Sequence, residues 1–429
     1  MRVPVVSGQR VERGLQIPSL LYGFFLAALI IDIGGAFGLK YGAFATIFVY
    51  VLMAALTNRM AIPASFSIME GALFIIAPIF FLFLAIGPFS VAPNAAVRGL
   101  TPFVTWLLYP LLLLIRPKER IISFFTTALF WGAVLVVIIF CVLFSLHFLG
   151  QSDLISRINI FAYRYRLGYF GQNPLGGGFE GFFPNVYFRW TLLFIPAAIL
   201  SLRGNKMKFI VLILAAFVTT STAVILFLLV GLLWASFGSL WRGKLSKVYV
   251  KRFTLFGVVL LIIAPMLYIS GYGDVGKFVI SKLSSTSAST SIKVGHIDSI
   301  LKLMSKDVAT LLLGMGVGSS FYSIGVDRVV TNVEVSHFNL LRQFGVVYAL
   351  GFFSYVLLLF SSLRRLDRTG KLLSISLAML FIAAGTNPLL ISPIFFLLLV
   401  ISRAYITLYA REKLASTELG GLMSAEMSS

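Results

Sequence analysis

Apolar runs of membrane-spanning length alternate along this chain with short polar connectors, most of which are basic. A helix needs about 20 predominantly apolar residues to cross roughly 30 Å of hydrocarbon. Ile121–Leu149, Val186–Leu202 and Phe253–Ile269 are clear examples. The alternation typical of barrel strands is not seen, and backbone groups inside a bilayer must be satisfied within helices. The pattern therefore predicts an all-α, polytopic membrane protein.

We expect about twelve membrane spans from these runs. They are Ile17–Ile33, Tyr41–Thr57, Gly71–Phe89, Thr101–Ile115, Ile121–Leu149, Val186–Leu202, Phe209–Thr219, Thr222–Leu240, Phe253–Ile269, Phe338–Leu363, Leu372–Ala384 and Leu389–Leu408.

Two stretches, Phe209–Leu240 and Leu372–Leu408, are too long for one span and short for two. Basic residues flank both ends of each stretch, so a single helix would place a basic cluster outside. We therefore interpret each as a tight hairpin, with turns at Thr220–Thr222 and Gly385–Pro388. Because the hairpins are short, their turns should lie below the outer surface, where polar backbone needs protein or water around it. An outward-facing hollow follows as a hypothesis.

Composition agrees with a membrane protein and limits the other classes. Hydrophobic residues make up 59% of the 429 residues, charged residues only 12%, and the mean hydropathy is +0.98. The polar first thirteen residues and the lack of a small-residue cleavage site argue against a cleaved signal peptide. Cys141 is the only cysteine, so neither a disulfide framework nor a thiolate metal site is expected.

The distribution of the net charge of +20 predicts how the chain is oriented. Alternate connectors are strongly basic, whereas the short connectors between them hold only Lys40 and Arg98. Lys and Arg accumulate in cytoplasmic connectors, so both termini are expected in the cytoplasm. The same scatter among connectors makes nucleic acid an unlikely partner. The basic connectors are Arg59, Arg116–Arg120, Arg203–Lys208, Arg242–Arg252 and Arg364–Lys371.

Two long polar loops, Gly150–Asn185 and Tyr272–His337, then fall on the outer side of the membrane. A protein that processes a large polar substrate at the membrane surface has a use for such loops. They divide the chain into six parts: a five-helix membrane region (1–149), the first loop (150–185), a four-helix membrane region (186–271), the second loop (272–337), a three-helix membrane region (338–408) and a cytoplasmic tail (409–429).

The first loop interleaves arginines with aromatic residues. Its candidate substrate-binding residues are Arg157, Arg164, Arg166, Arg189, Tyr163 and Tyr165. Guanidinium groups bind phosphate oxygens in pairs, and aromatic faces can stack on sugar rings. This pattern is suited to a diphosphate-linked sugar. The alternative is an interfacial belt that contacts lipid headgroups.

The second loop ends in a polar cluster that enters the next span. Glu334, His337 and Arg342 lie within about two helical turns, and Glu334 could orient the imidazole of His337. Arg342 lies inside an apolar run, where an unpaired charge is costly, which favours a polar hollow around it. A structural interfacial histidine is the alternative for His337. His296, earlier in the loop, is expected to be solvated.

An amphipathic helix is expected just before this cluster, because Ile297, Ile300, Leu301 and Met304 recur at helical spacing. It would lie either on the membrane surface or against the protein's own loops. Gly314–Gly318 lacks the Lys-Ser/Thr ending of a nucleotide loop, and we interpret it as a turn. No metal-ligand spacing is recognised in the sequence, so no metal and no cofactor are expected.

The layout and three segments of this chain resemble bacterial O-antigen polymerases and the related O-antigen ligases. The segments are Gly314–Ser319 (GMGVGS), Glu334–Gly345 (EVSHFNLLRQFG) and Gly385–Ser392 (GTNPLLIS). An arginine followed after ten residues by glycine, as in that family, occurs at Arg157/Gly168 and Arg166/Gly177. Two features depart from the ligase branch and favour a polymerase: Phe338 separates the histidine from Asn339, and the turn at Thr219–Thr222 has no arginine.

The resemblance implies a GT-C-like, metal-independent glycosyltransferase of the bacterial inner membrane. It would transfer a polysaccharide growing on undecaprenyl diphosphate to another lipid-linked repeat unit, in or near a complex with a flippase and a chain-length regulator. Arginines, including Arg342, would stabilise the departing diphosphate, and His337 or Glu334 would be the base. Asn339 would contact the saccharide. An O-antigen ligase and a lipid-linked oligosaccharide flippase or transporter are the alternatives.

Overall fold

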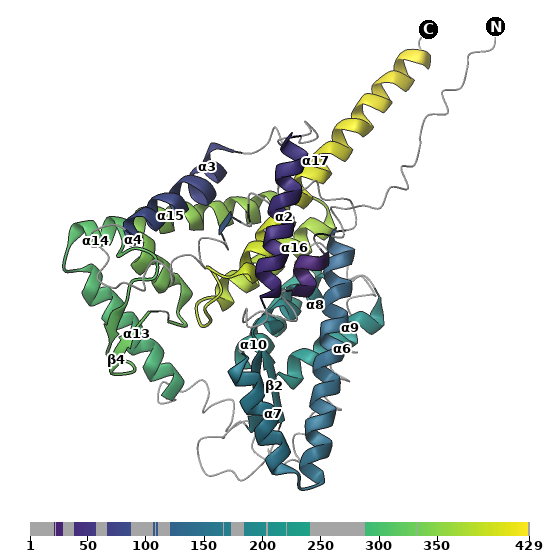
Figure 1. The fold of residues 1–429 in the computed structure, drawn as a ribbon. Coiled ribbons are helices and arrows are strands. Elements are labelled where there is room, and N and C mark those ends of the chain that lie inside the picture. Colours follow the sequence, from purple (N-terminus) through teal and green to yellow (C-terminus); the bar gives the residue numbers. More distant parts are fainter. Residues whose placement is uncertain are drawn as a thin grey trace.

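The computed structural model describes residues 21, 23–28, 38–56, 67–86, 106–107, 109, 121–165, 167–172, 184–202, 205–219, 221–240, 288–331 and 333–427. These residues are mostly helical, as the sequence predicts, with two short antiparallel hairpins (Figure 1). The helices are α2 (Leu39–Leu56), α3 (Ile68–Gly71), the π-helix η1 (Ala72–Ile76), α4 (Ala77–Ile86), α6 (Ile121–Phe148), α7 (Ser152–Arg164), the 3-10 helix η2 (Arg189–Leu193), α8 (Phe194–Ser201), α9 (Lys206–Val218), α10 (Thr222–Leu240), α13 (Ala288–Met304), α14 (Val308–Leu313), α15 (Ser336–Arg365), α16 (Arg368–Ala383) and α17 (Pro393–Met427). The strands are β1 (Gly168–Gln172), β2 (Pro184–Phe188), β3 (Phe321–Ser323) and β4 (Arg328–Val330).

Three helices in the described part of the chain are long and apolar enough to cross a membrane. They are Ile122–Phe148, Ser336–Arg365 and Pro393–Ala410. Helices also occupy most of the other expected spans that the structure describes, including α2, α9, α10 and α16. Phe253–Ile269 and most of Thr101–Ile115 lie outside the described residues. The full count of about twelve spans therefore stays a prediction.

The run Val186–Leu202 does not form the single helix that the sequence predicts. Its first residues belong to β2, and the chain then passes through η2 into α8. All eight residues of α8 are buried, against α6, α9, α10 and α16. A helix that is apolar on every side belongs in a protein core, so hydropathy alone cannot distinguish it from a lipid-facing span. α8 is the centre of the described helical core.

The described parts of the first loop form a compact substructure at the end of α6. α7 buries Ile155 and Ala162 and packs on β1 and α6. β1 pairs with β2, with Gly168 opposite Phe188. The side-chain oxygen of Asn159 accepts a hydrogen bond from the backbone N–H of Phe170 at 3.2 Å and so links helix and strand.

The second loop, from residue 288 onward, also has its own small core. Ile300 and Met304 of α13 pack against Phe321 of the β3–β4 hairpin and against Val333. The amphipathic helix expected in this region is therefore present, and its apolar side covers the protein's own hairpin. Packing against the protein's own loop is thus observed for Ile300 and Met304, whereas Leu301 of the same expected set is 52% exposed.

His296 is buried in this unit rather than solvated, which corrects the sequence-based expectation. Its side chain is 6% exposed, and Nδ1 lies 2.5 Å from the hydroxyl oxygen of Ser323. Burial lowers the pKa of His296, and the nearby carboxylate of Glu334 opposes this shift. No local pattern indicates this contact, because Ser323 lies 27 positions further along the chain, on the short strand β3.

α15 is kinked near its start, at Gly345. The backbone there has φ +73°, a conformation that glycine adopts without strain. The kink brings Gly345 against the carbonyl oxygen of Leu312 at the end of α14. Beyond it, α15 continues over Val346–Arg365, a length of about 30 Å at 1.5 Å per residue, which suffices to span a bilayer. Residues before Gly345 therefore belong to a separate short helix at the end of the span.

Candidate functional site

The segments Gly314–Ser319, Glu334–Gly345 and Gly385–Ser392 meet at the start of α15, although 14 residues separate the first two and 39 the last two. The backbone N–H groups of Met315 and Gly316 donate to the carbonyls of Arg342 and Gln343, at 2.8 Å and 3.0 Å. On the other side, the N–H of Ser336 donates to the carbonyl of Ala384 at 3.1 Å. The start of α15 is thus held between the turn after α14 and the turn between α16 and α17. We refer to this place as the α15 junction.

The guanidinium of Arg342 is fully buried at the α15 junction, and protein oxygens accept its hydrogen bonds. Nη1 donates to the carbonyl and hydroxyl oxygens of Ser319, both at 2.8 Å. Nη2 donates to the carbonyl of Thr331 at 2.7 Å and to Oδ1 of Asn339 at 2.9 Å. Nε also donates to Asn339, at 3.3 Å. The group lies 4.7 Å from the ring centre of Phe321.

This geometry changes the interpretation of Arg342. Each of its five N–H groups has an acceptor, so the cost of burying the charge is offset by charge-assisted hydrogen bonds. The sequence predicts polar surroundings for this charge, and the structure supplies them in the form of protein oxygens. Asn339, expected to contact saccharide, is 5% exposed, and its Oδ1 is one of these acceptors. Arg342 thus joins α15 to Ser319 and Thr331 of the second loop, and Asn339 holds the guanidinium in place.

Ser336 joins α15 to the turn Gly385–Pro388. Its hydroxyl donates to the carbonyl of Asn387 at 2.7 Å and accepts from the N–H of Leu389 at 2.6 Å. The sequence predicted that this turn would need protein or water around its polar backbone. The structure supplies protein, since the buried hydroxyl of Ser336 satisfies both a carbonyl and an amide of the turn.

His337 lies beside this turn and is half-buried. Its ring packs edge-on against Phe381, with ring centres 4.8 Å apart, and also contacts Phe353. The imidazole hydrogen-bonds the backbone of Phe381. A side-chain carbon added at Gly385 would lie 3.6 Å from Nδ1, an ordinary van der Waals distance, so the turn passes directly beside the ring. One backbone contact and two aromatic rings therefore orient this imidazole.

Glu334 does not orient His337, and the sequence-based hypothesis on this point is corrected. Its carboxylate is 3.5 Å from Nζ of Lys293, and the side chain is 59% exposed. The histidine whose titration it affects is His296. The physical reason is that Glu334 precedes α15 and points toward α13, whereas His337 faces α16.

Arg157 and Arg164, the two arginines of the first loop whose side chains the structure describes, differ from Arg342 in being exposed. Arg157 and Arg164 lie seven residues apart on α7, close to two full helical turns, so they share a face. Tyr163 is 78% exposed, and Tyr165 is half-buried against Phe161. Arg166 lies outside the described residues, as does the side chain of Arg189, the first residue of η2.

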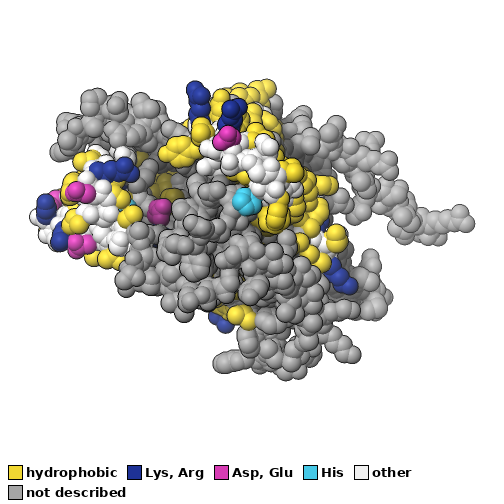
Figure 2. Space-filling model, turned by 90° about the horizontal axis from the view of Figure 1, so that it is seen from below, with side chains coloured by type: hydrophobic (Ala, Val, Ile, Leu, Met, Phe, Trp, Pro, Cys, Tyr) yellow, Lys and Arg dark blue, Asp and Glu magenta, His cyan; other side chains and the backbone are white. Residues whose placement is uncertain are grey.

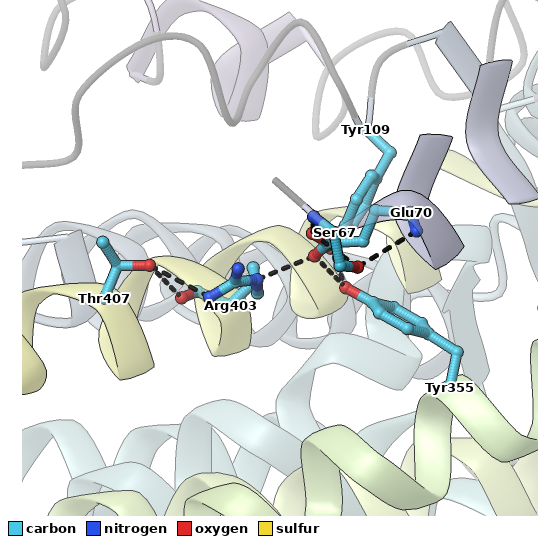
Figure 3. Close-up of polar contacts among 6 residues, drawn as sticks. All are labelled: Ser67, Glu70, Tyr109, Tyr355, Arg403 and Thr407. Atoms are coloured by element: carbon cyan, nitrogen blue, oxygen red, sulfur yellow. Dashed lines mark hydrogen bonds and ion pairs between the residues drawn. The ribbon is translucent and has the colours of Figure 1, made fainter. Parts of the chain in front are cut away.

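A second buried polar cluster lies on the side of α15 that faces α3 and α17, and the sequence analysis did not single it out. Glu70 is 1% exposed, and its Oε1 accepts hydrogen bonds from Nε of Arg403 and the hydroxyl of Tyr355, both at 2.7 Å (Figure 3). The hydroxyl of Tyr109 donates to the same oxygen at 3.1 Å and also contacts the hydroxyl of Tyr355. Ser67 donates to Oε2 from its backbone, at 2.8 Å.

This Glu70 cluster ties four segments of the chain together. Glu70 comes from α3, Tyr355 from α15 and Arg403 from α17, and Tyr109 from the short described stretch between α4 and α6 (Figure 3). The ring of Phe74 stacks on Tyr109, with centres 4.0 Å apart. Because the carboxylate and guanidinium neutralise each other and all the hydroxyls point inward, the cluster is suited to fixing helices rather than to binding a charged ligand.

Two signals in the sequence could have pointed to this cluster. Ser67 and Glu70 have the spacing of a capping box, and the structure shows both of its hydrogen bonds. Arg403 is a charge inside the apolar run Leu389–Leu408, where an ionisable residue calls for a partner. The pairing itself joins residues more than three hundred positions apart, and no local pattern encodes it.

Comparison with known proteins adds no relationship: no family model matches this chain, and no curated protein matches it. Within the described residues, no group of three or more His, Cys, Asp or Glu side chains is arranged to hold a metal ion.

Proposed function

We propose that this chain is a membrane glycosyltransferase that polymerises undecaprenyl-diphosphate-linked oligosaccharide repeat units into O-antigen or a related surface polysaccharide. One observation supports the proposal above the others. The three segments that resemble O-antigen polymerases lie in separate parts of the sequence, yet they converge on the α15 junction through direct hydrogen bonds. Residues of one functional centre are expected to converge in this way, whereas unrelated chance matches are not.

In the proposed reaction a hydroxyl group of the acceptor repeat unit attacks the anomeric carbon of the donor polymer. The bond from that carbon to the diphosphate oxygen breaks, and the carrier diphosphate leaves with the bonding electrons. The hydroxyl proton passes to a base, for which we propose His337, because it lies at the junction and its ring is already oriented. General-base catalysis of this kind contributes about 10²–10⁴-fold.

The departing diphosphate gains negative charge, and fixed cations lower the energy of that charge in the transition state. We propose the exposed Arg157 and Arg164 for this role, together with Arg166, since exposed guanidinium groups have donors available for phosphate oxygens. Arg342 has its donors occupied by protein oxygens, and we propose that it builds the site rather than binding substrate.

The proposal includes the topology expected from the sequence: about twelve spans in a bacterial inner membrane, both termini in the cytoplasm, and the two large loops in the periplasm. It also includes its partners, namely membrane lipids and the flippase and chain-length regulator of the same pathway. Reporter fusions within α7 and α13 test this topology. A cytosolic signal from either position would overturn the proposal.

A deletion strain separates the proposed function from its alternatives. Loss of the polymerase leaves lipopolysaccharide with a single repeat unit. Loss of a ligase instead leaves free polymer on the carrier lipid and a bare core, and loss of a flippase removes repeat units from the periplasm altogether. The single-repeat product supports the proposal, and either of the other two products refutes it.

The site assignment is tested by complementing that strain. The double variant Arg157→Ala/Arg164→Ala and the variant His337→Ala are each expected to insert normally but to give no long chains. Arg328→Ala, which removes an exposed arginine of the β3–β4 hairpin, is the matched control and should restore the full ladder. A wild-type ladder from both test variants would end the assignment.

A further inference from the structure

The short helix α14, with the sequence VATLLL, has no buried residue although five of its six side chains are apolar. Val308 is 69% exposed, and Leu311, Leu312 and Leu313 are between 38% and 44% exposed. Isolated apolar residues are common on protein surfaces, but a contiguous apolar patch usually marks an interaction site. α14 presents such a patch at the edge of the described unit.

α14 packs along α15 on one side, and polar contacts at both of its ends also hold it in place. At its start, the carboxylate of Asp307 accepts from the backbone N–H groups of Ala309 and Thr310, at 3.2 Å and 2.9 Å. These hydrogen bonds lower the pKa of Asp307, so this end carries a charge at neutral pH. After α14 the chain turns at Gly314 and bonds to the α15 junction. The apolar helix is therefore a fixed part of the fold.

The exposed side of α14 adjoins the side chains that a membrane span would present to lipid. The carbonyl of Leu312 contacts Gly345, where α15 kinks into its spanning part. Immediately afterwards α15 exposes Val347 at 62% and Leu350 at 60%. Figure 1 places α14 next to this end of α15. The end of α14 thus lies beside exposed apolar residues of a helix that is long enough to cross the membrane.

Other parts of the same unit have a different character. α13 carries an exposed ion pair, Lys302 with Asp298 at 2.8 Å, and exposed Lys306 follows it. In Figure 2, which views the molecule from below, Lys, Arg, Asp and Glu side chains gather on the left, in the region of α13 and the β3–β4 hairpin. The unit therefore has a charged side suited to water and an apolar edge beside the span.

We propose that α14 inserts into the boundary between lipid headgroups and acyl chains beside α15, and so anchors the second loop to the bilayer. The acyl chains of the surrounding lipid would then cover the apolar patch of α14. Asp307 and Lys306 would stay among the headgroups, while Leu311–Leu313 enter the hydrocarbon. The α15 junction, joined directly to the end of α14, is then fixed at headgroup depth. This inference does not depend on the proposed catalytic activity.

A single environment-sensitive fluorophore tests the depth of α14 in the full-length protein reconstituted in phospholipid bilayers. Cys141, the only cysteine, is exposed and is first removed as Cys141→Ala. The fluorophore is then attached to Leu312→Cys. Leu350→Cys, on the exposed side of the span, serves as the lipid-facing control, and Lys302→Cys on α13 serves as the water-facing control.

We expect the label at Leu312 to be quenched by nitroxide groups on the acyl chains about as strongly as the label at Leu350, and to be shielded from aqueous iodide. Quenching by iodide as strong as at Lys302 would overturn the proposal. A shielded label that does not respond to lipid nitroxides would show that protein, such as a second copy of the chain, covers α14, and would overturn it as well. If Leu312→Cys does not fold, Leu311→Cys gives the same test.

Discussion

Removing the charge of Glu70 should lower the free energy of unfolding by an amount that follows from how deeply its ion pair is buried. The carboxylate is 1% exposed, and its partner Arg403 is 16% exposed, so neither charge is well solvated by water. Breaking a buried ion pair by deleting one partner costs about 3–5 kcal/mol, because the remaining charge is left uncompensated. Glu70→Ala also takes away the acceptor of Tyr109 and Tyr355, and we expect a loss in this range.

Two further variants separate the contribution of the charge to that loss from the contribution of the hydrogen bonds to the tyrosines. Glu70→Gln keeps an oxygen that can accept from the tyrosines but removes the charge, and a hydrogen bond to a charged group contributes about 1.5–3 kcal/mol. Arg403→Ala leaves the carboxylate, the more buried of the two groups, without its counter-charge, so it should be at least as harmful as Glu70→Ala. The double variant should lose less stability than the sum of the single variants, because the two residues interact directly.

The measurement is reversible unfolding in mixed micelles, or thermal unfolding of the purified protein in the same lipid mixture. The matched control is Lys302→Ala, which breaks an ion pair whose side chains are 64% and 49% exposed. An exposed i,i+4 pair contributes only about 0.3–0.5 kcal/mol. If Glu70→Gln proved no more harmful than this control, the Glu70 cluster would not exist in the folded protein, and our account of how α3, α15 and α17 are joined would be wrong.

Three other variants test the α15 junction and the second loop. Arg342→Ala removes a buried guanidinium that donates to four oxygens of Ser319, Thr331 and Asn339, and a hydrogen bond to a charged group contributes about 1.5–3 kcal/mol. Thermal unfolding should therefore show a loss of at least about 3 kcal/mol, and an unchanged midpoint would contradict the guanidinium contacts. Gly345→Ala places a side chain in a left-handed backbone conformation and against a carbonyl, and should lower the unfolding midpoint far more than Gly351→Ala, which meets only one side chain at 3.3 Å. The pKa of His296 is lowered in the folded state, so the unfolded state binds the proton of this imidazole more readily. The free energy of unfolding therefore falls as the pH drops below the ordinary value of about 6.5. His296→Gln should reduce this dependence of stability on pH between about pH 7.5 and 5.5, and an unaltered dependence would show that His296 is not buried.

The sequence predicted the positions of the long helices well, because a membrane-length apolar run leaves the backbone few alternatives. Ile121–Leu149 became α6 almost to the residue, and Thr222–Leu240 coincides with α10. The same rule failed at Val186–Leu202, where the helix is enclosed by protein. Hydropathy shows that a segment avoids water but does not distinguish a lipid environment from a protein core. An apolar run therefore predicts a membrane span in both cases.

The candidate site could be predicted only in part, for a related reason. Sequence spacing found the segment from Glu334 to Gly345, and the structure places most of its polar residues at one junction. It could not predict which partner each residue would have. Glu334 pairs with Lys293, and Arg403 with Glu70, across distances in the sequence at which spacing carries no information. The kink at Gly345, three residues after Arg342, depends on the backbone conformation of a single residue.

The occupied guanidinium of Arg342 has a consequence for how arginine variants should be interpreted. A departing diphosphate needs donors that are free when its charge develops, and those of Arg342 are already committed to Ser319, Thr331 and Asn339. If the proposed function holds, replacing Arg342 should abolish activity by unfolding the junction, whereas replacing Arg157 and Arg164 should abolish it in an intact protein. Loss of long chains in both cases would look the same in a ladder, so only the stability of each variant distinguishes a residue that builds the site from one that binds the substrate.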